Sequence, residues 1–181
     1  MKKRILNRRS FFLLLPVALV LLDQITKIWA RGVLAGGKVI VLIPKALQFQ
    51  YLENRGAAWG MLQGRLNILS FVTFFLLILF LWLSFRVPEG KRFLPIYLVF
   101  LFIIAGAVGN LIDRLVFGYV TDFIYFSLIN FPIFNVADIY VTCSVILLVI
   151  LVLFYYTDDE LSFIPFFGTQ KSKDNPDESA S

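Results

Sequence analysis

The sequence predicts an all-α integral membrane protein with four transmembrane helices and a small antiparallel β-sheet on the extracytoplasmic side. The chain is 59% hydrophobic with a mean hydropathy of +0.82, too apolar for a soluble domain with a charged surface. A bilayer core about 30 Å thick needs roughly 20 apolar residues per helix. Four segments meet this requirement, namely 11–30, 66–85, 93–112 and 139–156. Between the first two, residues 47–52 alternate as a half-buried strand does.

The first apolar segment follows a basic N-terminus, with Lys2, Lys3, Arg4, Arg8 and Arg9. This pattern resembles a secretory signal peptide, but no small-x-small cleavage site follows, and the apolar run continues to Ala30. We therefore expect an uncleaved anchor whose N-terminus is cytoplasmic by the positive-inside rule. Four spans then return the C-terminus to the cytoplasm.

The connection after the first helix, about 31–65, is predicted to lie outside and to carry the sheet. Glycines and Pro44 surround two predicted strands, Val39–Ile43 and Leu47–Leu52. These form an outer β cradle over about 37–60. It leads into ENRGAAWG at 53–60, where small residues permit close backbone approach and Asn54 and Arg55 supply polar groups.

The second and third helices differ in what they offer. The second has no charge and is predicted to be scaffold. A short basic connection, 86–92, then fits the cytoplasmic side. The third ends in IIAGAVGNLIDRL, whose small residues allow a neighbouring helix to pack closely. Asn110 and Asp113, three residues apart, share one face of this helix.

The connection at about 113–135 is unusually aromatic for a loop, which predicts a segment lying in the lipid headgroup region. The fourth helix follows. We expect one membrane domain over 1–157 and a cytoplasmic tail over 158–181 that is disordered at its end.

Several function classes are excluded by composition. The chain has no histidine and one cysteine, so it can hold neither an ordinary zinc site nor a Ser/His or Cys/His nucleophile pair. We expect no metal and no cofactor. The net charge of +5 comes from short basic groups beside apolar segments rather than from a basic face, so nucleic acid is not an expected partner.

Two carboxylates in the apolar outer half carry the candidate chemistry. Asp122 and Asp138 have no adjacent basic residue. Two carboxylates held close in a low dielectric cannot both ionise easily, so one holds a proton while the other activates water. An alternative for Asp138 is a capping box in which Asn135 caps the fourth helix. The pair Asp113 and Asp138 is a second possible dyad that spacing does not exclude.

Two other carboxylates suit structural roles better. Asp23 and Lys27 lie one helical turn apart and can pair on one face of the first helix. Asp113 is followed by Arg114, whose guanidinium would favour the ionised carboxylate.

Together these residues resemble lipoprotein signal peptidase, also called signal peptidase II. The resemblance covers about 15–155. It is carried by Asp23, ENRGAAWG at 53–60, AGAVGNLIDR at 105–114, VTDF at 120–123 and FNVAD at 134–138. GNxxDR followed later by FNxAD is highly specific as a combination.

The resemblance implies a four-helix aspartic endopeptidase of the bacterial inner membrane. Such enzymes remove the signal peptide from diacylglyceryl-modified prolipoproteins, cleaving immediately before the lipidated cysteine, and globomycin inhibits them. We expect a monomer that meets its substrate and membrane lipids at the extracytoplasmic surface. The substrate would approach laterally from the bilayer.

The resemblance also implies roles for individual residues. Asp122 and Asp138 match the catalytic dyad. The supporting and substrate-binding positions are Asp23, Asn54, Arg55, Gly56, Asn110, Asp113, Arg114, Asn135 and Ala137. Three positions depart from the common pattern. Thr121 stands where valine is usual and adds a hydroxyl beside Asp122, Trp59 replaces a frequent phenylalanine, and Ala105 replaces a common glycine.

Three other functions remain to be compared. A proton-coupled carrier would use the aspartates as a proton relay. However, no inverted repeat is visible, and the second helix carries no charged residue. A structural membrane subunit would tolerate Asp122→Asn and Asp138→Asn. A Ser/Lys peptidase would need a lysine beside Ser127 or Ser162, and no helical lysine is placed to serve either.

Overall fold

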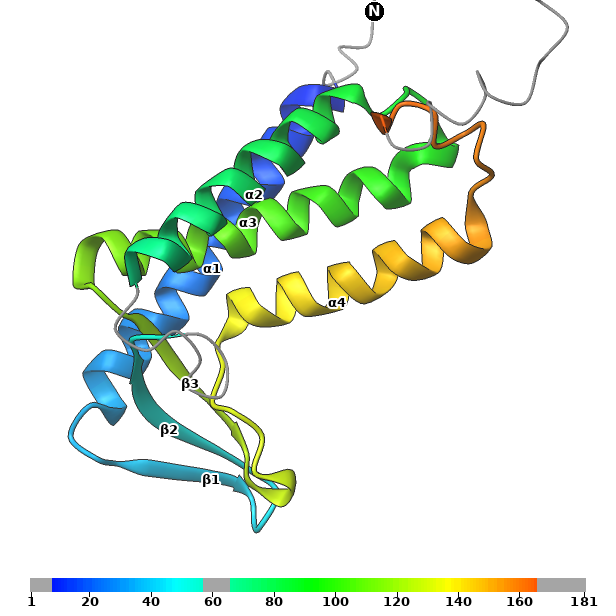
Figure 1. Cartoon of the computed structure of the whole chain (residues 1–181). Coiled ribbons are helices and arrows are strands. Elements are labelled where there is room, and N and C mark those ends of the chain that lie inside the picture. Colours follow the sequence, from blue (N-terminus) through cyan, green and yellow to red (C-terminus); the bar gives the residue numbers. More distant parts are fainter. Residues whose placement is uncertain (1–7, 57–65, 166–181) are drawn as a thin grey trace, which may run out of the picture.

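The computed structural model describes residues 8–56 and 66–165. It contains four long helices and one small sheet at their end (Figure 1). The helices are α1 (Arg8–Leu34), α2 (Leu66–Arg86), α3 (Leu94–Phe117) and α4 (Val136–Ile150). A 3₁₀ turn (Lys91–Phe93) precedes α3, and a π-helical turn (Leu151–Tyr155) continues α4. Each predicted apolar segment is thus helical, although α3 extends five residues beyond its expected end.

Three of the described helical segments are long and apolar enough to cross a membrane, namely Asn67–Arg86, Lys91–Phe117 and Val136–Tyr155. The helix α1 is not among these three segments. The fourth span therefore stays a prediction.

The sheet has the order β1 (Val39–Ile43), β2 (Leu47–Asn54) and β3 (Val120–Phe126), and both pairs of strands are antiparallel. The two predicted strands are confirmed. The expectation of a loop at β3 was wrong, because its β-branched and aromatic residues pair with β2. Leu52 lies opposite Asp122 in this register, and Val120–Phe123 are buried.

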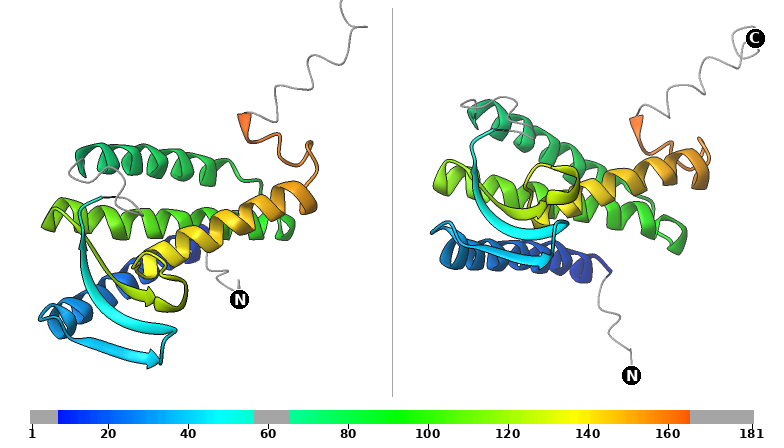
Figure 2. Two further views of the ribbon diagram at one scale, coloured as in Figure 1. Left: turned by 60° about the horizontal axis from the view of Figure 1, so that its bottom comes forward. Right: turned by 90° about the horizontal axis from the view of Figure 1, so that it is seen from below.

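The sheet packs one face against the end of α1, as the two further views show (Figure 2). Trp29, Phe49 and Phe123 form a triangle of edge-to-face ring contacts, with centroids 5.4 to 6.0 Å apart. Ala30 and Leu34 of α1 are fully buried beneath the rings. Since side chains alternate along a strand, Phe123 on this face leaves its neighbour Asp122 on the other.

The connection from β3 to α4 runs back alongside β3. Phe134 forms an isolated antiparallel bridge with Ile124. This bridge places Asn135, the residue that caps α4, beside β3.

Two glycines of α3 let neighbouring elements approach closely. A Cβ on Gly106 would lie 2.6 Å from the Ala137 carbonyl oxygen and from Val141 Cγ2 of α4, and one on Gly109 would lie 2.5 Å from Asp23 Oδ2. The small-residue contacts predicted for this helix are therefore confirmed.

The opposite end of the helices has its own apolar core. The chain after α4 folds back so that Tyr156 and Leu161 pack against α2 and α3 (Figure 1). Arg92 pairs with Glu160, with its Nε 2.9 Å from Oε1, and Tyr156 Oη donates to the Arg92 carbonyl oxygen at 2.9 Å. Part of the predicted tail thus packs on the bundle.

Candidate active site

Asp122 lies on β3 and accepts one hydrogen bond at each carboxylate oxygen. Asn54 Nδ2 of β2 donates to Oδ2 at 2.8 Å, and Asn135 Nδ2 donates to Oδ1 at 2.7 Å. The Asn54 amide is itself fixed, because its Oδ1 accepts the Gly56 N–H at 3.0 Å. Asp122 is 2% exposed, so these amides replace much of its hydration.

Asn135 connects Asp122 with Asp138 at the first turn of α4. Its Oδ1 accepts the Asp138 N–H at 3.1 Å, while its own N–H donates to Asp138 Oδ2 at 3.1 Å. This is the capping box that the sequence suggested. With Oδ1 engaged in the cap, Nδ2 is the group left to reach Asp122. Capping and a shared carboxylate site therefore occur together here rather than as alternatives.

Asn110 of α3 provides the second connection to Asp138. Its Nδ2 donates to Asp138 Oδ1 at 2.8 Å. Its Oδ1 accepts from Asn135 Nδ2 at 3.1 Å and from Lys27 Nζ at 2.8 Å. Lysine can only donate, so Lys27 sets the direction of the Asn110 amide.

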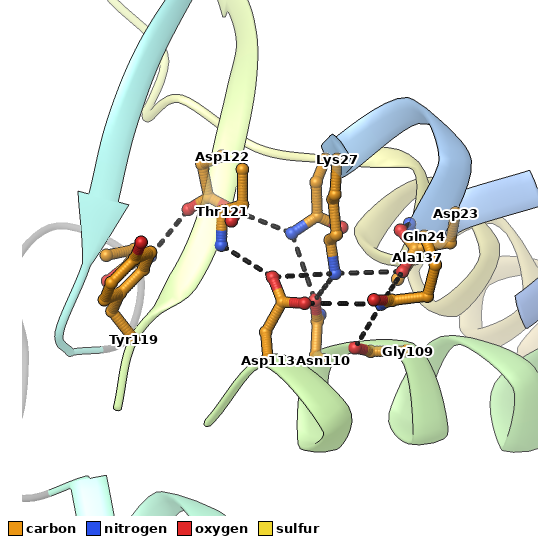
Figure 3. A network of polar contacts seen from close by, with 12 residues as sticks. Asp23, Gln24, Lys27, Gly109, Asn110, Asp113, Tyr119, Thr121, Asp122 and Ala137 are labelled. Carbon is orange, nitrogen blue, oxygen red and sulfur yellow. Dashed lines mark hydrogen bonds and ion pairs between the residues drawn. The ribbon is translucent and has the colours of Figure 1, made fainter. Parts of the chain in front are cut away.

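Lys27 lies at the centre of a fully buried charge cluster (Figure 3). Its Nζ lies 2.9 Å from Asp23 Oδ2 and 3.6 Å from Asp113 Oδ2. The predicted pair with Asp23 is confirmed, but Lys27 also joins α1 to α3. Because buried charges are tolerated only when compensated, each member depends on the others.

Asp23 also completes the N-terminus of α4. Its Oδ1 accepts the Ala137 N–H at 3.0 Å, a first-turn donor without an intrahelical partner. Gln24 Nε2 donates to Asp23 Oδ2 and to the Gly109 carbonyl oxygen, both at 3.1 Å. Asp23 thereby fixes α4 against α1 and α3, and with it the Asp138 backbone.

Asp113 anchors β3. Its Oδ2 accepts the Thr121 N–H at 2.9 Å and lies 3.8 Å from Arg31 Nη1. Arg114, which was expected to act on this carboxylate, interacts with Asp113 electrostatically. Lys27 and Arg31 lie within ion-pair distance of it.

The environment of Asp122 favours its protonated form. Burial, with the negative charge of Asp138 second, raises the pKa of Asp122 to about 7, against the lowering effect of the Asn54 and Asn135 amides. This is the behaviour expected of two nearby carboxylates in a low dielectric.

Two other predicted residues, Arg55 and Arg114, make no described hydrogen bond with the two carboxylates, although Arg114 interacts with both electrostatically. Arg55 pairs with Glu53 at 3.0 Å and lies over the Tyr119 ring, 5.7 Å from its centroid. Arg114 Nη1 is 3.5 Å from Thr73 Oγ1, and its buried Nε has no hydrogen-bond partner within the described part of the chain. Ala57–Gly60 of the predicted turn lie outside the described residues.

Sequence reasoning missed three contributors. Gln24 and Arg31 were not singled out, and Lys27 was assigned only to a pair within α1. The available signal was the face of α1 that carries Asp23, Lys27 and Arg31 at successive i, i+4 positions.

Known proteins are similar to this chain in sequence and in fold. The family described as signal peptidase (SPase) II matches residues 15–154. The lipoprotein signal peptidase of Clostridium novyi (strain NT) is 41% identical over 137 residues, 74% of this chain and 91% of that protein. That of Staphylococcus carnosus (strain TM300) is 39% identical over 147 residues, 80% and 91% of the respective chains. A solved bacterial membrane enzyme is 34% identical and has a TM-score of 0.70, over 81% of this chain and 95% of the other.

Proposed function

Because the chain belongs to the signal peptidase II family, whose relatives are lipoprotein signal peptidases, we propose that it removes signal peptides from diacylglyceryl-modified prolipoproteins as a metal-free aspartic endopeptidase. Cleavage falls immediately before the lipidated cysteine. The observation that carries the proposal is the junction at Asn135, which binds both Asp122 and Asp138 through hydrogen bonds.

In the proposed reaction, one carboxylate of the pair takes a proton from water as the water oxygen attacks the scissile carbonyl carbon. The other, protonated, donates to the carbonyl oxygen. When the tetrahedral intermediate collapses, the C–N bond breaks and the amine of the lipidated cysteine leaves with a proton. The raised pKa of Asp122 supports a dyad that retains one proton at neutral pH.

Asp122 is preferred over Asp113 as the partner of Asp138. Asp113 is engaged by the Thr121 N–H and by Lys27 and Arg31, which suits an ionised anchor rather than a proton carrier. Asp122 receives only neutral amide donors among the described hydrogen bonds.

The proposed orientation puts the sheet and the dyad at the extracytoplasmic surface of the bacterial inner membrane, with both termini in the cytoplasm and the enzyme acting as a monomer. The start of α1 and the segment after α4 both lie away from the sheet, at the other end of the helices (Figure 1), which supports this topology. The substrate then enters the site sideways from the bilayer.

The activity is tested with purified protein in detergent and a diacylglyceryl-modified prolipoprotein, whose cleavage shifts its mobility in a gel. We expect cleavage that resists a metal chelator and is absent with the unlipidated precursor. Chelator-sensitive cleavage would contradict the metal-free mechanism. If folded protein left the lipidated substrate intact, a carrier or structural role would become the better account.

A further inference from the structure

Two cationic side chains extend from the same face of α1, one turn apart. Each contacts a residue that lies beside a different one of the two carboxylates. Lys27 contacts Asn110, which binds Asp138. Arg31, four residues on, donates from Nη1 to Thr121 Oγ1 at 2.7 Å. Thr121 directly precedes Asp122 on β3. Lys27 therefore helps to position Asp138 on α4, and Arg31 helps to position the strand that bears Asp122.

We propose that Arg31 and Thr121 form a positioning pair that fixes β3, and hence the Asp122 carboxylate, for the cleavage reaction. The inference rests on the proposed function. Neither residue is required to touch substrate, because the pair acts through the backbone of the strand.

Thr121 is held from three sides. Its N–H donates to Asp113 Oδ2 of α3, its hydroxyl accepts from Arg31 of α1, and it lies opposite Glu53 in β2. It is fully buried. Displacing this residue would move the adjacent Asp122 relative to its donors Asn54 and Asn135.

Arg31 is itself held in place. Its guanidinium lies 4.4 Å from the Phe117 ring centroid and 3.8 Å from Asp113 Oδ2, and its side chain is 19% exposed. A cation held by an aromatic face and a carboxylate loses little further freedom on binding a hydroxyl. The position that the sequence marked as unusual, a hydroxyl-bearing residue before the aspartate, is thus the acceptor for this arginine.

The pair predicts a specific pattern in a double-mutant cycle. Arg31→Met and Thr121→Val should each lower kcat about five- to tenfold with little change in KM, because small displacements of a reacting group reduce rate more than binding. The double variant should be no slower than Arg31→Met alone, since the contact that Thr121→Val removes is already absent in Arg31→Met. Thr121→Ser retains the hydroxyl and should restore most of the rate.

The experiment measures kcat and KM for cleavage of the lipidated prolipoprotein, with the thermal midpoint of each variant recorded in the same detergent. Lys91→Met, at an exposed position in the 3₁₀ turn before α3, is the matched control that should behave as wild type. Asp122→Asn defines the background rate.

Two results would overturn the inference while the proposed function stands. One is wild-type kcat in Arg31→Met and Thr121→Val, even with lowered thermal midpoints, which would leave the pair a purely structural role. The other is losses that multiply in the double variant, which would mean that the two residues act separately. An inactive wild-type protein would instead overturn the proposed function, and this inference with it.

Discussion

At the scale of single residues, the site depends on asparagines whose amide directions are set by neighbours. The Gly56 N–H fixes Asn54, the α4 cap fixes Asn135, and Lys27 fixes Asn110. Each then directs an NH₂ group at a carboxylate oxygen. Two acidic side chains are thereby linked through neutral amide groups.

The raised pKa of Asp122 predicts a pH-dependent effect of Asp122→Asn on stability. A carboxyl whose pKa rises from 3.8 to about 7 on folding stabilises the folded state most below pH 4, and this contribution falls as the pH rises to about 7. Asparagine does not titrate. The thermal midpoint of the variant relative to wild type should therefore increase between pH 4 and pH 7 and then level off.

Differential scanning fluorimetry in one detergent across this pH range measures the difference, and Asp158→Asn, an exposed aspartate, is the control. A difference that does not change between pH 4 and pH 7 would show that Asp122 titrates near its ordinary pKa in the folded protein.

At the scale of elements, the site forms where β3, α1, α3 and α4 meet. The sequence located most of these elements, because apolar length and strand alternation are local signals. It missed β3, because that strand depends on pairing with β2, which is distant in the chain. Local motifs likewise identified Asp23, Asn110 and Asn135. They could not show that Lys27 and Arg31 point from α1 into the cluster, since that depends on the packing of helices.

Close packing of α3 on α4 predicts that Gly106→Ala lowers both the stability and the activity of the protein. The added Cβ would meet the Ala137 carbonyl oxygen, which is backbone and cannot rotate away. We expect a loss of about 1–3 kcal/mol in stability and lower activity, because α4 carries Asp138.

Gly32→Ala is the matched control, since a Cβ there meets no described atom within 4 Å and alanine favours the helix. Thermal midpoints and cleavage rates of the two variants are compared. Equal behaviour of Gly106→Ala and Gly32→Ala would argue against close α3–α4 packing.

At the scale of the whole molecule, the two ends of the bundle carry different tasks. The sheet end holds the buried charges and the carboxylate pair, while the opposite end is closed by an apolar cluster that includes Leu161. Stability and activity should therefore be separable by mutations at the far end.

Leu161→Ala tests this separation. Leu161 is completely buried, so its truncation should cost about 2–5 kcal/mol of stability while kcat changes less than about twofold at a temperature where the variant is folded. Leu153→Ala, at a 66% exposed position, is the control and should lower the thermal midpoint much less. A large fall in kcat for folded Leu161→Ala would show that the two ends are coupled.

The identity of the carboxylate pair is the central claim, and cleavage of diacylglyceryl-modified prolipoprotein by Asp122→Asn and Asp138→Asn tests it most directly. Both variants should remain folded and lose at least about a thousandfold in kcat, while Asp158→Asn cleaves at the wild-type rate. Retained turnover in Asp122→Asn, with turnover abolished in Asp113→Asn, would contradict the claim and assign the dyad to Asp113 and Asp138.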